Sequence, residues 1–168
     1  MLKADMLITQ VDQFFLDKRQ RAAKLSPRLR AHHNFHESSE SPVQRLSIAL
    51  QPDTYVRPHR HVEFHQWEMI ILLTGEVQLL VFDDSGAVTS RILLSHKTRC
   101  VLVELPVGTW HSLFPVAGEA TILEVKQGPY RAAKPEDVFA PWAPEEGSDA
   151  AQACLSWMQQ AEVGQRFV

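Results

Sequence analysis

The sequence predicts a mostly β protein, a sandwich or barrel with a helix before the strands and a short helix after them. Seven or eight short apolar segments follow one another between residues 43 and 126, with no helical pattern between them. Ten prolines and seven glycines supply the many turns that such a chain needs. A length of 168 residues allows one domain with a substantial core.

The first element expected is a helix over residues 6–23. Thr9 can cap its start, and Asp12 follows three positions later. The residues that build its apolar face are Val11, Phe14, Phe15 and Leu16. Ser26 and Pro27 end the segment, and the polar stretch 28–40 is interpreted as a linker.

This linker carries His32, His33 and His36. Three neighbouring histidines suggest a second metal site. However, the segment has no strong periodicity and no carboxylate or cysteine partner at a recognised spacing. We therefore expect these histidines at the surface or at the rim of a pocket.

The first strand follows, because Leu46, Ile48 and Leu50 alternate with more polar residues. After a turn at residues 51–54, a second strand would place four side chains on one face. These side chains are Tyr55, Arg57, His59 and His61. If the histidines point inward, Arg57 is a candidate clamp for a carboxylate or phosphate, and a solvent-exposed arginine is the alternative interpretation.

The next strand, residues 67–74, is apolar except for Glu68. An unpaired carboxylate is costly to bury, so we expect a metal ion or an arginine to satisfy it. Gly75 then turns the chain, and Asp83 to Gly86 form a strong hairpin signal. The remaining strands are expected at residues 77–82, 88–94, 101–105, 110–114 and 121–126.

Four side chains from separate segments form a candidate metal centre. They are His59, His61, Glu68 and His111. Imidazoles and a carboxylate are the ligands of a borderline divalent metal such as Zn, Fe, Mn or Ni. We therefore expect one divalent metal ion as the cofactor, held in the interior.

The spacing of these residues resembles that of the cupin family. The first cupin motif consists of His59, His61, Glu68 and Gly75, and the second of Pro106, Gly108 and His111. The resemblance implies a double-stranded β-helix, or jelly-roll barrel, in which three histidines and one glutamate hold a divalent metal. It covers roughly residues 28–148 and is closer still to the WbuC-type cupin proteins found among bacterial polysaccharide genes. The segments that carry this closer likeness are 42–46, 57–61, 81–84, 106–111, 126–130 and 139–147.

The chain departs from the cupin pattern between the first motif's histidines and its glutamate. Six residues separate His61 from Glu68, where the pattern has three or four. His65 or Glu63 could therefore be the ligand instead, although counting back from Gly75 favours Glu68. Cys100 and Pro115 replace a glycine and an asparagine at the ends of the second motif, and neither position is a ligand in the pattern.

The chain is divided into an N-terminal helix and linker arm (1–36), a cupin β-barrel (37–130) and a C-terminal extension (131–168) with a helix near 148–160. Four residues are candidates for binding an anionic substrate: Tyr55, Arg57, Arg45 and Lys126. No catalytic residue is assigned. The resemblance also implies a homodimer.

Composition excludes some classes of partner. The net charge is −3 and no basic tract is present, so nucleic acid is not expected. No apolar run is long enough for a membrane span, and the first residues carry no evident signal peptide. Cys100 and Cys154 lack a CxxC spacing and are expected to be reduced thiols. Together these features favour a cytoplasmic protein with a small-molecule ligand.

The function expected is that of an enzyme of the isomerase, epimerase or lyase type. Its substrate would be a small carbohydrate-derived or anionic molecule, in bacterial surface polysaccharide metabolism. The alternatives are an iron-dependent oxygenase and a non-catalytic metal-containing module, because the cupin fold supports all three.

Overall fold

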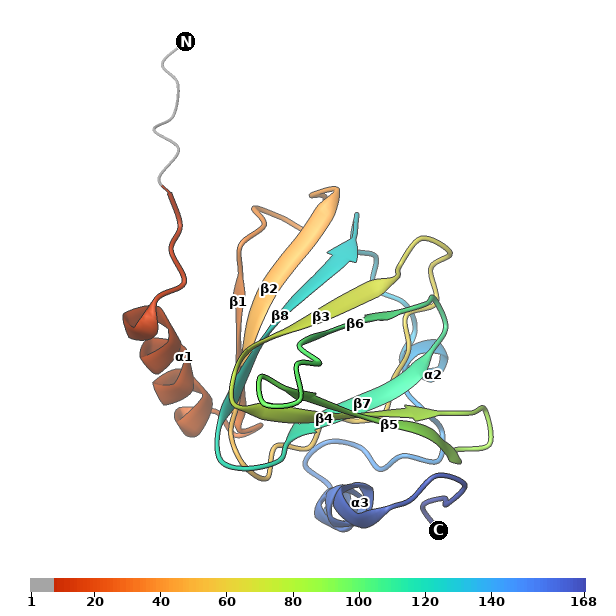
Figure 1. Cartoon of the computed structure of the whole chain (residues 1–168). Helices are drawn as coiled ribbons and strands as arrows, with labels where there is room; N and C mark the ends of the chain where they lie inside the picture. The colour runs from red at the N-terminus through yellow and green to blue at the C-terminus, as the bar shows by residue number, and fades with distance from the viewer. Residues whose placement is uncertain (1–7) are drawn as a thin grey trace.

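The structure is a computed structural model, and it describes residues 8–168. Two antiparallel sheets face each other (Figure 1). One sheet has the strand order β1-β2-β8-β3-β6 and the other the order β5-β4-β7. The strands are β1 (Arg30–Asn34), β2 (Val43–Leu50), β3 (Glu68–Thr74), β4 (Glu76–Phe82), β5 (Val88–Ser95), β6 (Leu102–Leu105), β7 (Trp110–Pro115) and β8 (Ala120–Gln127). The predicted mostly β fold, with a helix at each end, is confirmed.

The main core fills the space between the sheets. Ile48 of β2 lies opposite Ile122 of β8, which in turn lies opposite Leu72 of β3. All three side chains are buried, together with Val77 and Leu79 of β4. Alternation along these strands therefore directs one apolar face of each sheet inward.

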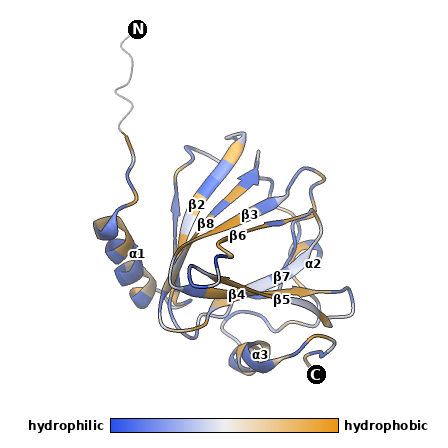
Figure 2. Ribbon diagram, viewed as in Figure 1, coloured by the Kyte–Doolittle hydropathy of each residue, from blue (hydrophilic) through white to orange (hydrophobic). Residues whose placement is uncertain are grey.

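A second core lies on the outer face of the β5-β4-β7 sheet. Leu80 and Phe82 point there, toward the helix α3 (Asp149–Gln160) and the chain that leads to it. Trp142 packs on Phe82 with ring centroids 5.0 Å apart, as expected for an anchor of the extended tail. Both faces of β4 are thus covered, which explains why its second half, residues 79–82, is continuously apolar (Figure 2).

Two glycines are required by close approaches of the chain. Gly75, between β3 and β4, has φ +78°, and a Cβ atom there would lie 2.5 Å from the carbonyl oxygen of Glu119. Gly86, in the predicted hairpin, has φ +83°, and a Cβ atom would lie 2.9 Å from the Trp142 ring. Any other residue at these positions would clash and be strained.

The first helix, α1 (Gln13–Leu25), begins later than predicted. Asp12, rather than Thr9, is its N-cap, because the Asp12 side chain accepts a hydrogen bond from the Phe15 amide at 2.9 Å. The first two residues of the predicted helix, 6–7, lie outside the described residues, as does the segment inspected for a signal peptide. Within residues 8–168, no helix is both long enough and apolar enough to cross a bilayer.

Two further predictions of local structure are wrong. Residues 30–34, interpreted as linker, form β1 and pair with β2 along the edge of the larger sheet. Residues 55–61 are irregular rather than a strand, and only His59 makes β-bridges, with His111 and with Phe139. Pro58 has no amide hydrogen to donate to a neighbouring strand, which weakens regular pairing here. A short helix that the sequence did not predict, α2 (Pro135–Val138), follows β8.

Candidate metal centre

The main chain brings three histidines together. His59 lies on the irregular segment beside β7. Its amide donates to the His111 carbonyl at 3.0 Å, and the His111 amide donates to the His59 carbonyl at 2.9 Å. The Gly108 amide donates to the His61 carbonyl at 2.9 Å. These bonds tie the segment of the first motif to the turn and strand of the second.

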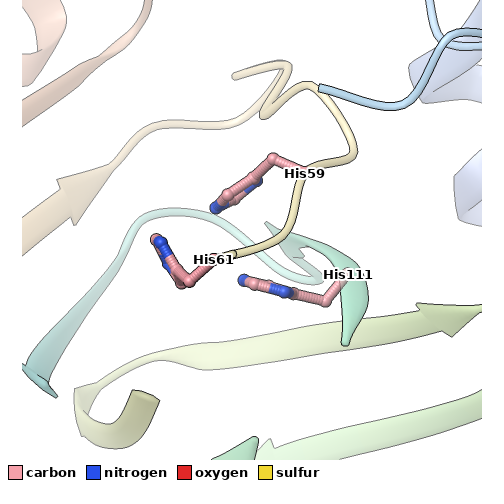
Figure 3. A group of neighbouring side chains, drawn as sticks. All are labelled: His59, His61 and His111. Atoms are coloured by element: carbon pink, nitrogen blue, oxygen red, sulfur yellow. The ribbon is translucent and has the colours of Figure 1, made fainter. Parts of the chain in front are cut away.

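The three imidazoles face a common space (Figure 3). Each offers one ring nitrogen, and these nitrogens lie within 4.8 Å of one another. Ring centroids are 4.4 Å apart for His59 and His111, and 5.6 Å apart for His59 and His61. The cluster could therefore hold one metal ion.

The far side of two of the rings is fixed by main-chain carbonyls. Nδ1 of His59 lies 3.0 Å from the Arg57 carbonyl oxygen, and Nδ1 of His111 lies 2.9 Å from that of Thr109. A carbonyl only accepts hydrogen bonds, so each Nδ1 must carry a proton. In the neutral ring, Nε2 then presents its lone pair to the cluster, as in a metal-ligating histidine.

Glu68, the first residue of β3, closes the cluster from the opposite side. Its side chain is 2% exposed, and Oε2 lies 2.9 Å from Nε2 of His111 and 3.4 Å from Nε2 of His61. Oε2 has no well-aligned hydrogen-bond donor in the described part of the chain. Two ligand atoms that are each about 2.1 Å from one ion lie about 3.0–3.4 Å apart, so these distances fit a shared divalent cation.

The charges around the cluster shift its titration. Burial lowers the pKa of His59 well below its ordinary value, and the neighbouring His111 lowers it further. Burial opposes ionisation of Glu68, but Lys126 and the two imidazoles outweigh it and hold the pKa of the Glu68 carboxyl well below its usual range. For His111, the proximity and charge of the Glu68 carboxylate outweigh burial and raise its pKa.

A buried ion-pair network continues from Glu68 along β8. Nζ of Lys126 lies 3.3 Å from Oε1 of Glu68 and also pairs with Glu124. Burial and the Glu68 charge raise the pKa of Glu124 to about 7. Burial opposes the charge of Lys126, but the two carboxylates outweigh it and raise its pKa. Glu124 and Lys126 lie in the strand predicted at residues 121–126. Because they are two positions apart, their charged side chains point to the same face of that strand.

A cavity of about 420 Å³ opens beside the cluster, and His59, Glu124 and Lys126 line it. Its other walls come from β1, β2 and the chain before α3. A smaller cavity of about 150 Å³, lined by His61, Gln66 and Tyr130, lies on the other side of the cluster. Small molecules can therefore reach the cluster from the larger cavity.

Of the four predicted substrate-binding residues, two line the larger cavity and two lie elsewhere. Arg57 and Lys126 line the larger cavity. Tyr55 does not: it is 7% exposed, lies in the second core, and donates a hydrogen bond to the Pro144 carbonyl at 3.0 Å. Arg45 lies on the outer face of β2 and donates to the Phe35 carbonyl at 3.2 Å. The irregular chain after residue 54 explains why Tyr55 and Arg57 do not share a strand face.

His65, the alternative ligand, is not a member of the three-histidine group found within residues 8–168. Its ring packs against Phe64, and its Nε2 is buried without a hydrogen-bond partner. Of the linker histidines, His32 and His36 line the larger cavity, whereas His33 packs edge-on against Phe15.

The sequence did not predict four charged residues of the larger cavity: Arg28, Arg30, Glu124 and Glu146. Residues 28, 30, 32, 34 and 36 alternate with less polar ones, and this period of two was the available signal for β1. Glu146 had no such signal, because it lies in the extended tail.

Comparisons with known proteins agree with this fold. The family described as Domain of unknown function (DUF6016) matches residues 11–94. Among curated proteins, no match to the sequence is found. Several solved structures are similar, and a cupin-2 domain protein from Rhodospirillum rubrum is 14% identical, with a TM-score of 0.50 over 77% of this chain and 80% of that one.

Two other similar structures have lower scores. One is a cupin 2 conserved barrel domain protein from Rhodopseudomonas palustris, 17% identical, with a TM-score of 0.47 over 64% of this chain and 69% of that one. Another is a cupin superfamily protein from Desulfitobacterium hafniense, 14% identical, with a TM-score of 0.46 over 58% and 76%. The likeness to the Rhodospirillum protein supports the cupin fold.

Proposed function

This chain belongs to the family described as Domain of unknown function (DUF6016), and from its site we propose that it is a metal-binding cupin enzyme. Its substrate is a small anionic or carbohydrate-derived molecule, and its reaction is an isomerisation, epimerisation or elimination. The likeness of its motifs to those of WbuC-type cupins favours a role in bacterial surface polysaccharide metabolism.

One observation carries the metal proposal. Nε2 of His111 and of His61 both face Oε2 of Glu68, with no aligned donor between them and the carboxylate. Lone pairs that face each other in the interior repel unless a proton or a metal ion lies between them. The Lys126 ammonium lies 3.3 Å from Oε1 of Glu68 and 3.5 Å from Nε2 of His61, so a proton on His111 or a metal ion is needed between His111 and Oε2. A divalent ion held by His59, His61, Glu68 and His111 would supply a Lewis acid for an oxygen of the substrate.

The proposed acid–base group is the buried pair beside the cluster. Glu124 and Lys126 line the larger cavity together, and Nζ of Lys126 contacts both Glu124 and Glu68. A proton taken from substrate carbon can be held on the Glu124 carboxylate, while the Lys126 ammonium keeps its charge compensated. Arg57 opens toward the same cavity and is suited to bind an anionic group.

Exchange of substrate hydrogen with solvent tests this proposal. Isomerisation, epimerisation and elimination beside a carbonyl all begin by removing a proton from carbon, so the zinc- or manganese-loaded protein should introduce deuterium from D₂O into its substrate. A panel of sugar phosphates and uronic acids is followed by NMR, with wild type compared with Glu124→Gln and with Arg45→Ala as the outward-facing control. Exchange by wild type and the control, but not by Glu124→Gln, supports the enzyme. A metal-loaded protein that exchanges no hydrogen in any of these compounds indicates a non-catalytic module.

A further inference from the structure

Strand β1 turns a row of polar side chains into the larger cavity. Arg30, His32 and Asn34 lie on one face of the strand, and Arg28 and His36 continue the row at its two ends. Four residue steps along a strand span about 13 Å, which is longer than a single sugar ring. This polar row is larger than a ligand held only at the metal centre would need.

The wall beside this row is apolar. In the register of the sheet, His32 lies opposite Ile48 and Asn34 opposite Leu46, and both apolar residues line the cavity together with Val56. The polar row leads to the candidate metal centre. Leu46 of β2 lies opposite Glu124 of β8, and Lys126, two residues further along β8, lies opposite Glu68 of β3. The cavity can thus accommodate a carbon skeleton that has hydrogen-bonding groups along one side.

The end of the cavity remote from Glu68 carries an excess of positive charge. Arg28, Arg30 and Arg57 line this end together with one carboxylate, Glu146, so three guanidinium groups and one carboxylate leave a net charge of +2. The guanidinium groups of Arg28 and Arg30 face Glu146, whereas Arg57 contacts it through its main-chain amide at 3.5 Å. Arg30 is 7% exposed and is already satisfied, because it pairs with Glu146 and donates to the Tyr55 carbonyl at 2.8 Å. The Arg30 guanidinium therefore contributes positive charge to this end of the cavity, while its Nη1 and Nη2 atoms already have partners within the protein.

The other two arginines have free donors. Nη1 of Arg28 lies 3.8 Å from Glu146, beyond a hydrogen bond, and the Arg28 side chain is 52% exposed. Arg57 is held by a bond from Nε to the Ala143 carbonyl at 3.1 Å and by the Phe139 ring at 5.0 Å. Within residues 8–168, neither Nη atom of Arg57 makes a hydrogen bond. The Arg57 side chain lines the larger cavity and also a neighbouring cavity of about 320 Å³, which Phe139 lines as well.

We propose that Arg28 and Arg57 form a distal subsite for a dianionic group, a phosphate monoester, of a ligand whose other end reaches the metal centre. The carbon skeleton lies along Leu46, Ile48 and Val56, and its hydroxyl groups contact His32 and Asn34. This assignment names the substrate class of the proposed enzyme as a phosphorylated polyhydroxy compound, and it rests on that proposed function only for the role of the metal end. Two guanidinium forks match the charge and the oxygen geometry of a phosphate.

Binding of inorganic phosphate to the full chain tests the subsite. Calorimetry at constant ionic strength is performed on the zinc-loaded wild type and on Arg28→Ala, Arg57→Gln and Arg45→Ala. Both cavity variants should weaken phosphate binding by at least about tenfold, since each loses charge-assisted hydrogen bonds. Arg45→Ala removes an arginine from the outer face of the same sheet and should bind as wild type does.

Two further arms separate this subsite from the metal centre. Glu68→Gln, which damages the proposed metal centre, should keep phosphate binding within about threefold of wild type. Loss of phosphate binding in Glu68→Gln, or equal weakening by Arg45→Ala, overturns the subsite, as does tighter binding of succinate than of phosphate. If zinc binds and phosphate does not, the subsite is wrong and the metal proposal stands. If phosphate binds and zinc does not, the metal proposal is wrong.

Discussion

Oε2 of Glu68 lies 2.9 Å from Nε2 of His111, and both side chains are almost completely buried. Nδ1 of His111 donates to the Thr109 carbonyl and therefore carries a proton. Nε2, which faces Glu68, presents a lone pair if the ring is neutral and carries a second proton if the ring is charged. A metal ion and a proton therefore compete for the same place between these two residues.

The identity of the carboxylate ligand can be tested by a matched pair of substitutions. Glu68→Gln keeps the size of the side chain but removes the charge beside His61 and His111. We expect it to weaken zinc binding at least about tenfold, whereas His65→Ala should leave the affinity unchanged. Calorimetric titration of both variants measures this, and the reverse order would make His65 the ligand.

Zinc affinity should fall as the pH falls through the raised pKa of His111, so that the loss is already under way at the ordinary imidazole value of about 6.5, because imidazole must be neutral to bind metal. The raised pKa of His111 means that the metal-free protein takes up a proton there before its other ligands do. The lowered pKa values of His59 and His61 keep those rings neutral over the same range. The logarithm of the affinity should therefore decrease by about one per pH unit. An affinity that is constant between pH 7 and pH 5 would argue against histidine ligation.

Metal binding should stabilise the folded chain. At a free zinc concentration 100 times the dissociation constant, the free energy of unfolding should rise by about 2.7 kcal/mol. Thermal unfolding of wild type with zinc and after chelation measures the shift, and His59→Ala should show a much smaller one. An equal shift in His59→Ala would place the bound zinc elsewhere.

The anchor of the C-terminal tail should contribute to stability in proportion to its packing. Trp142→Ala removes the contact with Phe82 and should cost about 2–3 kcal/mol of unfolding free energy. Trp142→Phe keeps an aromatic ring and removes a buried indole N–H, which has no hydrogen-bond partner among residues 8–168. It should therefore cost less than Trp142→Ala in urea titrations. Equal losses for the two variants would show that ring packing is not the source.

Sequence periodicity predicted the strands whose two faces differ, and it failed where structure depends on distant partners. Leu46, Ile48 and Leu50 alternate with more polar residues, and Ile48 and Leu50 lie in the core between the sheets. β1 has a polar face and no strong apolar one, so only its pairing with β2 defines it as a strand. Its polar face was therefore interpreted as linker.

The candidate metal site shows the same division. The residue types and spacing predicted a metal site of His59, His61, Glu68 and His111. The structure groups the three histidines and places Glu68 beside His61 and His111, while neither Glu68 nor His65 is a member of the three-histidine group found within residues 8–168. The surroundings could not be predicted in the same way. Glu146 reaches Arg30 across 116 positions of sequence, and no local pattern indicates such a contact.

Anomalous diffraction from a crystal of the zinc-loaded chain tests the central claim most directly. Data collected on either side of the zinc absorption edge locate the ion independently of the protein atoms. We expect one strong peak among Nε2 of His59, His61 and His111 and the carboxylate of Glu68. A zinc peak elsewhere, or an anomalous map without any peak at these four residues, would contradict it.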